Sequence, residues 1–257
     1  MRNNVAGASL LPSHSGMGVI FRREFSSYFN APVAYVFMVA FLLLTGFLTF
    51  MVAQFYERRI ADLSVFFLWH PWVYLLLVPA ATMGLWAEER RNGTIELLLT
   101  MPVTLGQILL GKFLAAWLFI AIGLALTFPV VVTVGWLGSP DYGVIVCGYA
   151  GSLLLAGACV AVGTFASALT RSQVVSFVIA LGMCLLFNLA GYPPVTNLFA
   201  GWAPSWLLEG VAACSFMQHF EAICRGVFDV YDVAYYAAVM VFMLAAAHVV
   251  VDNRKGS

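Results

Sequence analysis

Six long apolar stretches dominate the sequence and decide what the chain can fold into. A helix needs roughly twenty mostly apolar residues to cross the hydrocarbon core of a bilayer. The stretches cover residues 32–53, 65–86, 105–136, 144–168, 174–190 and 233–251. Inside a bilayer the backbone must satisfy its own hydrogen bonds, so apolar runs of this length form helices. The sequence therefore predicts an all-α integral membrane protein with six transmembrane helices.

The composition agrees with this class. Hydrophobic residues make up 63% of the chain and charged residues only 9%, whereas a soluble domain carries roughly 25% charged residues. The formal net charge is zero, so no nucleic-acid partner is indicated. The first residues lack the sustained apolar core of a cleavable signal peptide. We expect residues 1–16 to form a disordered tail and residues 17–257 a single membrane domain.

Lysine and arginine are unevenly divided between the two sides of the predicted bundle. Cytoplasmic loops of membrane proteins carry an excess of these residues, so their distribution predicts orientation. If both termini are cytoplasmic, nine lie inside and three outside. The inner set is Arg2, Arg22, Arg23, Arg90, Arg91, Lys112, Arg171, Arg254 and Lys255, and the outer set is Arg58, Arg59 and Arg225. The sequence therefore predicts that both termini are cytoplasmic.

The stretch between the last two predicted spans, residues 191–232, fits neither a span nor a loop. It is too rich in Pro, Gly and Trp for an ordinary membrane helix, and too apolar for a solvated connection. We expect it to form re-entrant outer helices that dip part-way into the membrane. Near its end, Asp229 and Asp232 are expected to lie in water close to Arg225 in an outer turn.

The same stretch holds two candidate pieces of cysteine and metal chemistry. His219, Glu221, Cys224 and Asp229 could bind a metal ion, but they match no recognised ligand spacing. Cys214 and Cys224 either form a disulfide or pack as two thiols, because spacing alone does not fix connectivity.

Residues 106–113 imitate a phosphate-binding loop. Their sequence, GQILLGKF, has both glycines and the lysine of that motif, but Phe113 stands where a Ser or Thr would bind magnesium. A phosphate loop also needs a glycine-rich turn that points several N–H groups at the phosphates, whereas residues 107–110 favour helix at the start of a span. We expect no nucleotide site here. Lys112 is expected to extend to the cytoplasmic headgroups, as lysines near span ends commonly do.

A charged break separates the second and third predicted spans. The sequence LWAEERRNGTIELLLTMPVT, residues 85–104, reads as helix, break, short helix and stop. Gly93 can end a helix with positive φ, Thr94 can cap the next one, and Glu96 suits a positive helix end. The residues after the break leave an apolar surface beside charge at the membrane face. The alternative is an ordinary charged turn that holds two spans in place.

An amphipathic helix is predicted before the first span, at residues 20–29. Apolar residues recur at helical spacing opposite a charged group, as a helix lying in the membrane interface requires. A plain membrane anchor is the alternative. The apolar residues are Ile20, Phe21, Phe25 and Phe29, and the charged ones are Arg22, Arg23 and Glu24.

The predicted spans contain almost no ionisable groups. Apart from Lys112 they hold only His70 and His248, which we expect to be satisfied near an interface. Intramembrane ionisable groups mark ion and proton pathways, so an apolar, lipid-linked or polypeptide cargo is favoured. An intramembrane enzyme would need a Ser–His pair, a carboxylate dyad or a zinc cluster within a span, and the predicted spans show none of these.

Pro79 and Pro129 are expected to kink their spans, either as hinges or as packing features.

Several segments together resemble the ABC-2 class of transporter permeases, in particular the branch that includes gliding-motility permeases. The resemblance rests on EERRNGTIELLLTMPVT followed by GQILLGKFLAAW, on FRREFSSYFNAPVAYVF near the start, and on FEAICRGVFDVYDVAYY near the end. It covers nearly everything after Met17. It implies a type V exporter-like fold, with an N-terminal interfacial helix, a cytoplasmic coupling helix after span 2 and re-entrant helices before span 6.

The resemblance also implies where a partner would bind. In that family the short helix after the second span docks on a separate ATPase subunit, which binds the ATP and Mg²⁺; the permease itself is not an enzyme. This places the coupling helix at residues 93–101 and the connecting helix before span 1. The implied coupling and approach residues are Glu88, Glu89, Arg90, Arg91, Gly93, Thr94, Glu96, Leu97, Leu98 and Met101, and the connecting-helix residues include Phe21, Arg22, Arg23, Glu24 and Phe25.

The resemblance further implies that the chain is half of a transporter in a bacterial inner membrane. A second permease copy, identical or related, would complete the membrane part, and relatives suggest a further membrane partner with a large outer domain. The complex would export or extract cargo. The alternative is a non-transporting scaffold whose ATPase partner transmits force to an envelope structure.

Overall fold

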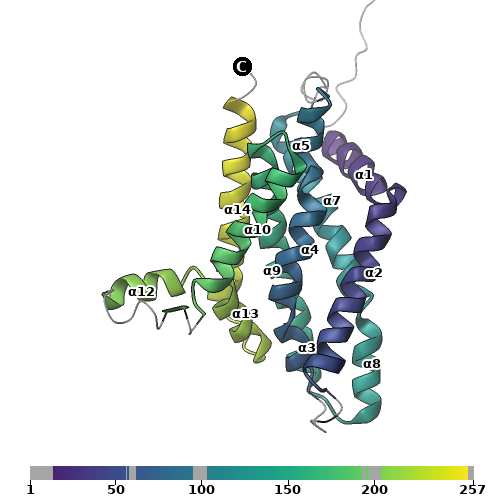
Figure 1. Cartoon of the computed structure of the whole chain (residues 1–257), viewed down its shortest axis with the longest axis vertical. Helices are drawn as coiled ribbons and strands as arrows, with labels where there is room; N and C mark the ends of the chain where they lie inside the picture. The colour runs from purple at the N-terminus through teal and green to yellow at the C-terminus, as the bar shows by residue number, and fades with distance from the viewer. Residues whose placement is uncertain are drawn as a thin grey trace, which may run out of the picture.

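The structure is a computed structural model that describes residues 14–55, 57, 62–94, 103–192, 195–196 and 204–253. Within these ranges the chain forms helices and turns, with no strand. Figure 1 shows most helices running along the long axis, with α12 projecting sideways. The first elements are α1 (His14–Asn30), α2 (Pro32–Phe47), the π-helix η1 (Leu48–Val52), α3 (Ser64–Leu68), α4 (His70–Thr82) and α5 (Gly84–Arg91). They are followed by α7 (Leu105–Ala125), α8 (Phe128–Leu137), α9 (Tyr142–Leu169), α10 (Gln173–Leu189), α12 (Ser205–Ala212), α13 (Phe216–Cys224) and α14 (Val230–Asn253).

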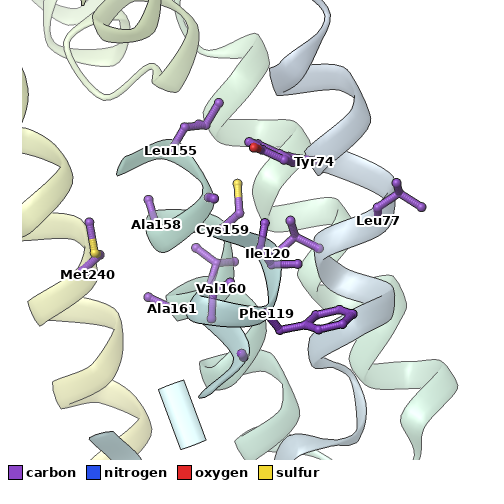
Figure 2. Close-up of a cluster of buried hydrophobic side chains, with 14 of the residues drawn as sticks. Tyr74, Leu77, Phe119, Ile120, Leu155, Ala158, Cys159, Val160, Ala161 and Met240 are labelled. Carbon is purple, nitrogen blue, oxygen red and sulfur yellow. The ribbon is translucent and has the colours of Figure 1, made fainter. Parts of the chain in front are cut away.

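Helix α9 forms the centre of the bundle. It packs against α4, α7, α10 and α14, and its middle residues are fully buried. Figure 2 shows part of this core, in which Cys159 and Val160 of α9 lie near Tyr74 of α4 and Ile120 of α7. Glycines on α9 admit its neighbours closely: a Cβ at Gly148 would lie 2.4 Å from the Phe67 ring. Small residues of this kind let membrane helices approach one another without a hydrophobic driving force.

Four of the six predicted spans are long and apolar enough to cross a membrane, judged by length and composition. These are Ala34–Val52, Leu105–Leu137, Tyr142–Leu169 and Val230–Asn253. Of the remaining two, Gln173–Leu189 is a shorter apolar helix of 17 residues. The predicted span at residues 65–86 is divided among α3, α4 and α5. The six-span count therefore stays a prediction.

The prolines explain part of this division. Pro129 lies where the span Leu105–Leu137 is interrupted: it is in the first turn of α8, after α7 has ended at Ala125. Pro71 likewise lies in the first turn of α4. Proline has no N–H, and the first turn of a helix is where that donor is not needed. Pro79 does lie inside α4, four residues before the break between α4 and α5.

The ends of the described ranges limit two expectations. Residues 1–13 lie outside them, and α1 begins at His14, so the last residues of the expected tail are helical. In the stretch at 191–232, α12 and α13 are two short helices, and their depth in a membrane stays a prediction. Figure 1 places α1, α5 and the C-terminal end of α14 at one end of the bundle, and α3 and α8 at the other.

Candidate functional site

Residues 106–113 are helical, as expected, and form no phosphate loop. They belong to α7, which begins with a capping box: Thr104 Oγ1 accepts a hydrogen bond from the Gln107 N–H at 3.4 Å, and Gln107 Oε1 accepts one from the Thr104 N–H at 3.2 Å. Gly111 serves helix packing, because a Cβ there would lie 3.0 Å from the Ile20 side chain of α1. This glycine lets α1 cross α7 closely.

Lys112 follows that crossing, and the expectation that it extends to the headgroups is wrong. The residue is 1% exposed. Its Nζ lies 2.9 Å from Glu89 Oε1 of α5 and 3.1 Å from Glu24 Oε1 of α1. The ammonium also lies 5.5 Å from the centre of the Trp86 ring, within the range of a cation–π interaction. Because α1 and α5 cover this end of α7, the Lys112 ammonium pairs with two carboxylates and does not reach the surface.

Arg23 completes a charged cluster with Glu24, Glu89 and Lys112. Its Nη2 lies 2.8 Å from Glu24 Oε1 and 3.1 Å from Glu89 Oε1. Two cations thus share two carboxylates, and the formal charges cancel. The Arg23 side chain is 49% exposed and that of Lys112 is 2% exposed, so the cluster runs from the surface into the core.

The place of Glu24 corrects a second expectation. The helical pattern put Glu24 on the polar face of the first helix with Arg22 and Arg23, but its side chain is turned toward α7 and is largely buried. An isolated charge is costly to bury unless it is paired, so Glu24 and Lys112 each supply the partner that the other needs. The cluster therefore joins α1, α5 and α7.

Helix α1 has further contacts with the bundle beyond this cluster. The Tyr28 hydroxyl donates a hydrogen bond to the Ala81 carbonyl at 3.1 Å, and its ring stacks on Phe119 with centroids 4.8 Å apart. Burial, and next the charge of Glu24, raise the pKa of Tyr28, which keeps the hydroxyl a donor. As the spacing predicted, Phe21 and Phe25 lie together on one face, with their rings stacked 5.7 Å apart. Helix α1 is thus held by specific contacts and not only by its apolar surface.

The end of α5 confirms the predicted helix terminator. Gly93 has φ +71°, and the Thr94 N–H donates to the Glu89 carbonyl at 3.0 Å. This six-to-one hydrogen bond is the one that defines a Schellman motif, in which glycine accepts positive φ without strain. The Thr94 hydroxyl also donates to the Glu89 carbonyl, at 3.3 Å. Glu89 therefore anchors the turn with its backbone and the cluster with its side chain.

The other predicted coupling residues divide between two groups. Glu88 and Arg91 are exposed on α5, and Arg90 is half-buried there. The rest of the predicted coupling helix, including Glu96, Leu97, Leu98 and Met101, lies outside the described residues.

The predicted outer residues do not form one water-exposed group. Asp232 is 6% exposed, and its Oδ1 lies 2.6 Å from His219 Nδ1, so the expectation that it lies in water is wrong. Arg225 instead lies 3.8 Å from Glu221 at the surface, and Asp229 accepts a hydrogen bond from the Tyr231 N–H. Asp232 lies in the first turn of the long helix α14, where His219 of α13 covers it; no sequence pattern predicts that packing.

The residues of the metal and disulfide alternatives in this stretch all lie within the described ranges. Among the described residues, no group of three or more His, Cys, Asp or Glu could hold a metal ion. Cys214 and Cys224 are free thiols, the first exposed and the second half-buried. Burial, and next the Glu221 charge, raise the pKa of Cys224 to about 12, so its thiolate is scarce. The arrangement is that of two separate thiols.

Comparison with known families decides the identity of the chain. The family model described as ABC-2 family transporter protein matches residues 19–251. The chain belongs to the ABC-2 family. Among curated proteins, none matches it. This family supplies the membrane component of ABC transporters, is not itself an ATPase and typically works with an ABC ATPase partner. With its apolar helices, the ABC-2 chain is a multi-pass membrane protein.

His70 of this ABC-2 protein is packed inside the bundle, and its expected closeness to a membrane interface stays a prediction. It is fully buried, and its Nδ1 donates to the Phe66 carbonyl at 3.1 Å. The rings of Phe66 and Tyr74 lie 4.6 and 5.6 Å from it, measured between centroids. The histidine is therefore a packed core residue that begins α4.

Replacement of Asp232 by asparagine tests the outer contact of the ABC-2 chain. His219 Nε2 also lies 3.0 Å from the Ala213 carbonyl, so the imidazole joins α14 to the turn before α13. We expect Asp232→Asn to lower the free energy of unfolding by about 1–3 kcal/mol, because a charge-assisted hydrogen bond is lost in a buried position. Thermal unfolding in lipid nanodiscs measures this. Asp229→Asn is the matched control, because Asp229 is exposed; equal losses in both variants would contradict the prediction.

Proposed function

We propose that this chain is the permease subunit of an ATP-driven exporter or extraction machine, in which residues 93–101 are the coupling helix and α1 is the connecting helix. The observation that carries the proposal is the charged cluster. Glu89 lies in the last turn of α5, directly before the proposed coupling helix, and its carboxylate binds Arg23 of α1 and Lys112 of α7. A displacement of the coupling helix would therefore act on three helices at once.

The mechanism requires no nucleotide chemistry in this chain. A separate ATPase subunit binds ATP and Mg²⁺ and closes when ATP is bound. It pushes on the coupling helix, which carries Glu96, Leu97, Leu98 and Met101. The charged approach to this helix is made by Glu88, Glu89, Arg90 and Arg91. The Schellman turn at Gly93 and Thr94 ends α5 at the start of the proposed coupling helix. The ionic contacts at Glu89 then pass the displacement to α1 and α7 as a rigid-body shift of packed elements.

The assembly completes this proposal. Two copies of the chain, or this chain and a related permease, pair with two ATPase subunits in a bacterial inner membrane, with both termini cytoplasmic and six spans in each permease. The gliding-motility branch is the proposed subfamily, with a membrane partner that carries a large outer domain. The scarcity of ionisable groups in the apolar stretches favours an apolar, lipid-linked or polypeptide cargo.

A cross-linking experiment tests the coupling assignment. The permease chain is co-expressed with its candidate ATPase and carries a photo-reactive amino acid in place of Thr94. This position is exposed at the start of the proposed coupling helix. We expect a cross-link to the ATPase from this position. A loss of ATPase binding in Glu89→Ala would not test the coupling assignment by itself, because this variant also removes a partner of buried Lys112.

The control places the same amino acid at Val227, which is 62% exposed in the turn before α14. We expect no ATPase cross-link there. Cross-links from Val227 but not from Thr94 would overturn the assignment, as would ATP hydrolysis by the purified chain without its partner.

A further inference from the structure

The break between α4 and α5 contains a hydrogen-bonding side chain from a third helix. Ser167 of α9 is fully buried. Its Oγ accepts hydrogen bonds from the N–H groups of Trp86 at 2.9 Å and Ala87 at 3.1 Å. The same hydroxyl donates to the Met83 carbonyl at 2.9 Å. One side chain of α9 thus contacts the backbone on both sides of the break.

These backbone groups are the ones that a broken helix leaves unsatisfied. Trp86 and Ala87 are the third and fourth residues of α5, and the first four N–H groups of a helix have no partner within it. Met83 is the single residue between the two helices. An unpaired backbone group costs most where water cannot reach it. The Ser167 hydroxyl therefore replaces hydrogen bonds that a continuous helix would make for itself.

The backbone beside the break is weakened on the α4 side as well. Pro79 has no N–H to donate within α4. The Thr82 hydroxyl donates back to the Val78 carbonyl at 2.9 Å, a contact that often bends helices. The Met83 N–H donates to the Pro79 carbonyl at 2.9 Å, so the backbone hydrogen bonds of α4 reach Met83. On the α5 side of Met83, the N–H groups of Trp86 and Ala87 bond to Ser167 of α9.

Helix α9 also fixes the last turn of α4 close to Ser167. Gly163 lies one turn before Ser167, on the same face of α9. A Cβ at Gly163 would lie 2.0 Å from Thr82 Oγ1, so α4 and α9 are in close contact there. The same face of α9 thus holds the end of α4 through Gly163 and the start of α5 through Ser167.

We infer that the Ser167 hydroxyl is a clasp that makes α5 and α4 move as one, so that displacement of the coupling helix reaches the opposite end of the bundle. Ser167 is in this sense a positioning residue for the coupling segment, and the inference rests on the proposed function. If the clasp is lost, α5 still follows the coupling helix, but α4 no longer follows α5.

The first test examines the clasp in the isolated chain. Ser167→Ala removes the hydroxyl, and Ser152→Ala is the matched control: it is the same change on the same helix, at a fully buried serine whose Oγ has no hydrogen-bond partner among the described residues. We expect amide hydrogen exchange at Trp86 and Ala87 to accelerate about fivefold or more in Ser167→Ala, consistent with loss of a net-stabilising hydrogen bond at each amide. The control should exchange like the wild type. Equal exchange in both variants would overturn the clasp.

The second test examines transmission in the complex with the ATPase. Distances between pairs of spin labels are measured by double electron–electron resonance, with and without a non-hydrolysable ATP analogue. The labels are attached to non-natural amino acids, because the chain has five free cysteines. One pair, Arg91 and Arg171, lies beside the end of α5. The other pair is Leu68, the last residue of α3 just before α4, and Tyr142, the first residue of α9. All four residues are exposed. We expect the analogue to change both distances in the wild type and in Ser152→Ala. In Ser167→Ala only the first distance should change.

The outcomes separate the two proposals. If Thr94 of the wild type does not cross-link to the ATPase, the proposed function fails, whatever the exchange rates show. If that cross-link forms and the distance between Leu68 and Tyr142 still changes in Ser167→Ala, the clasp fails and the coupling assignment stands.

Discussion

Replacing Lys112 with methionine is expected to destabilise the bundle by about 3 kcal/mol, at the lower end of the range for breaking a buried ion pair. Glu24 and Glu89 would lose the cation that they share, 3.1 and 2.9 Å away. Arg23 would still contact both carboxylates from the surface, which limits the loss. Methionine retains most of the side-chain volume, so packing changes little. The measurement is thermal unfolding of the purified chain in nanodiscs, together with the folded yield after extraction.

A second substitution shows whether charge is the cause. Glu89→Gln added to Lys112→Met removes one of the two carboxylates that lost their cation, so the double variant should recover part of the stability. Arg22→Met is the control, because Arg22 lies exposed on α1 and should change stability by less than about 0.5 kcal/mol. If Lys112→Met and Arg22→Met have the same thermal stability, the cluster does not stabilise the fold. Its proposed role in transmitting displacement would then be contradicted as well.

The cluster marks the limit of what the sequence could predict here. The helical pattern of residues 20–29 and the terminator at Gly93 are local features, and both are found as predicted. The partner of Lys112 is not local, because Glu24 and Glu89 come from helices far from it in the chain. A lysine near the end of a span reaches either headgroups or a buried carboxylate, and only the crossing of α1 over α7 at Gly111 decides between them.

The outer end and the second span show the same limit for different reasons. Asp232 reads as a solvated acid until α13 places His219 against it. The stretch at 65–86 is predicted as one span because it is predominantly apolar. Hydropathy does not reveal a helix break whose backbone groups are hydrogen-bonded by a side chain of another helix. Ser167, which supplies those bonds, is an unremarkable small residue within α9. Features that depend on contacts between helices were thus the ones that sequence patterns missed.

Gly163→Ala is the other change with a large expected effect. Alanine normally stabilises a helix by about 1 kcal/mol relative to glycine, so a loss of stability here must come from packing. The new Cβ would lie 2.0 Å from Thr82 Oγ1 and 2.8 Å from Thr82 Cβ, both of which are buried between α4 and α9. We expect a loss of about 3 kcal/mol, near the upper end of the usual cost of overpacking a core. Thermal unfolding in nanodiscs measures it.

Two companion variants separate this contact from the general effect of adding a methyl group. Gly182→Ala in α10 has nothing within 4 Å of the new Cβ, so it should leave stability unchanged or raise it slightly through helix propensity. Thr82→Ala combined with Gly163→Ala removes the nearest atom and leaves the Thr82 Cβ at 2.8 Å, so recovery should be partial. A Gly163→Ala chain as stable as Gly182→Ala would mean that α4 separates from α9 at little cost. The end of α4 would then not be held beside Ser167, and α9 could not transmit motion across the break.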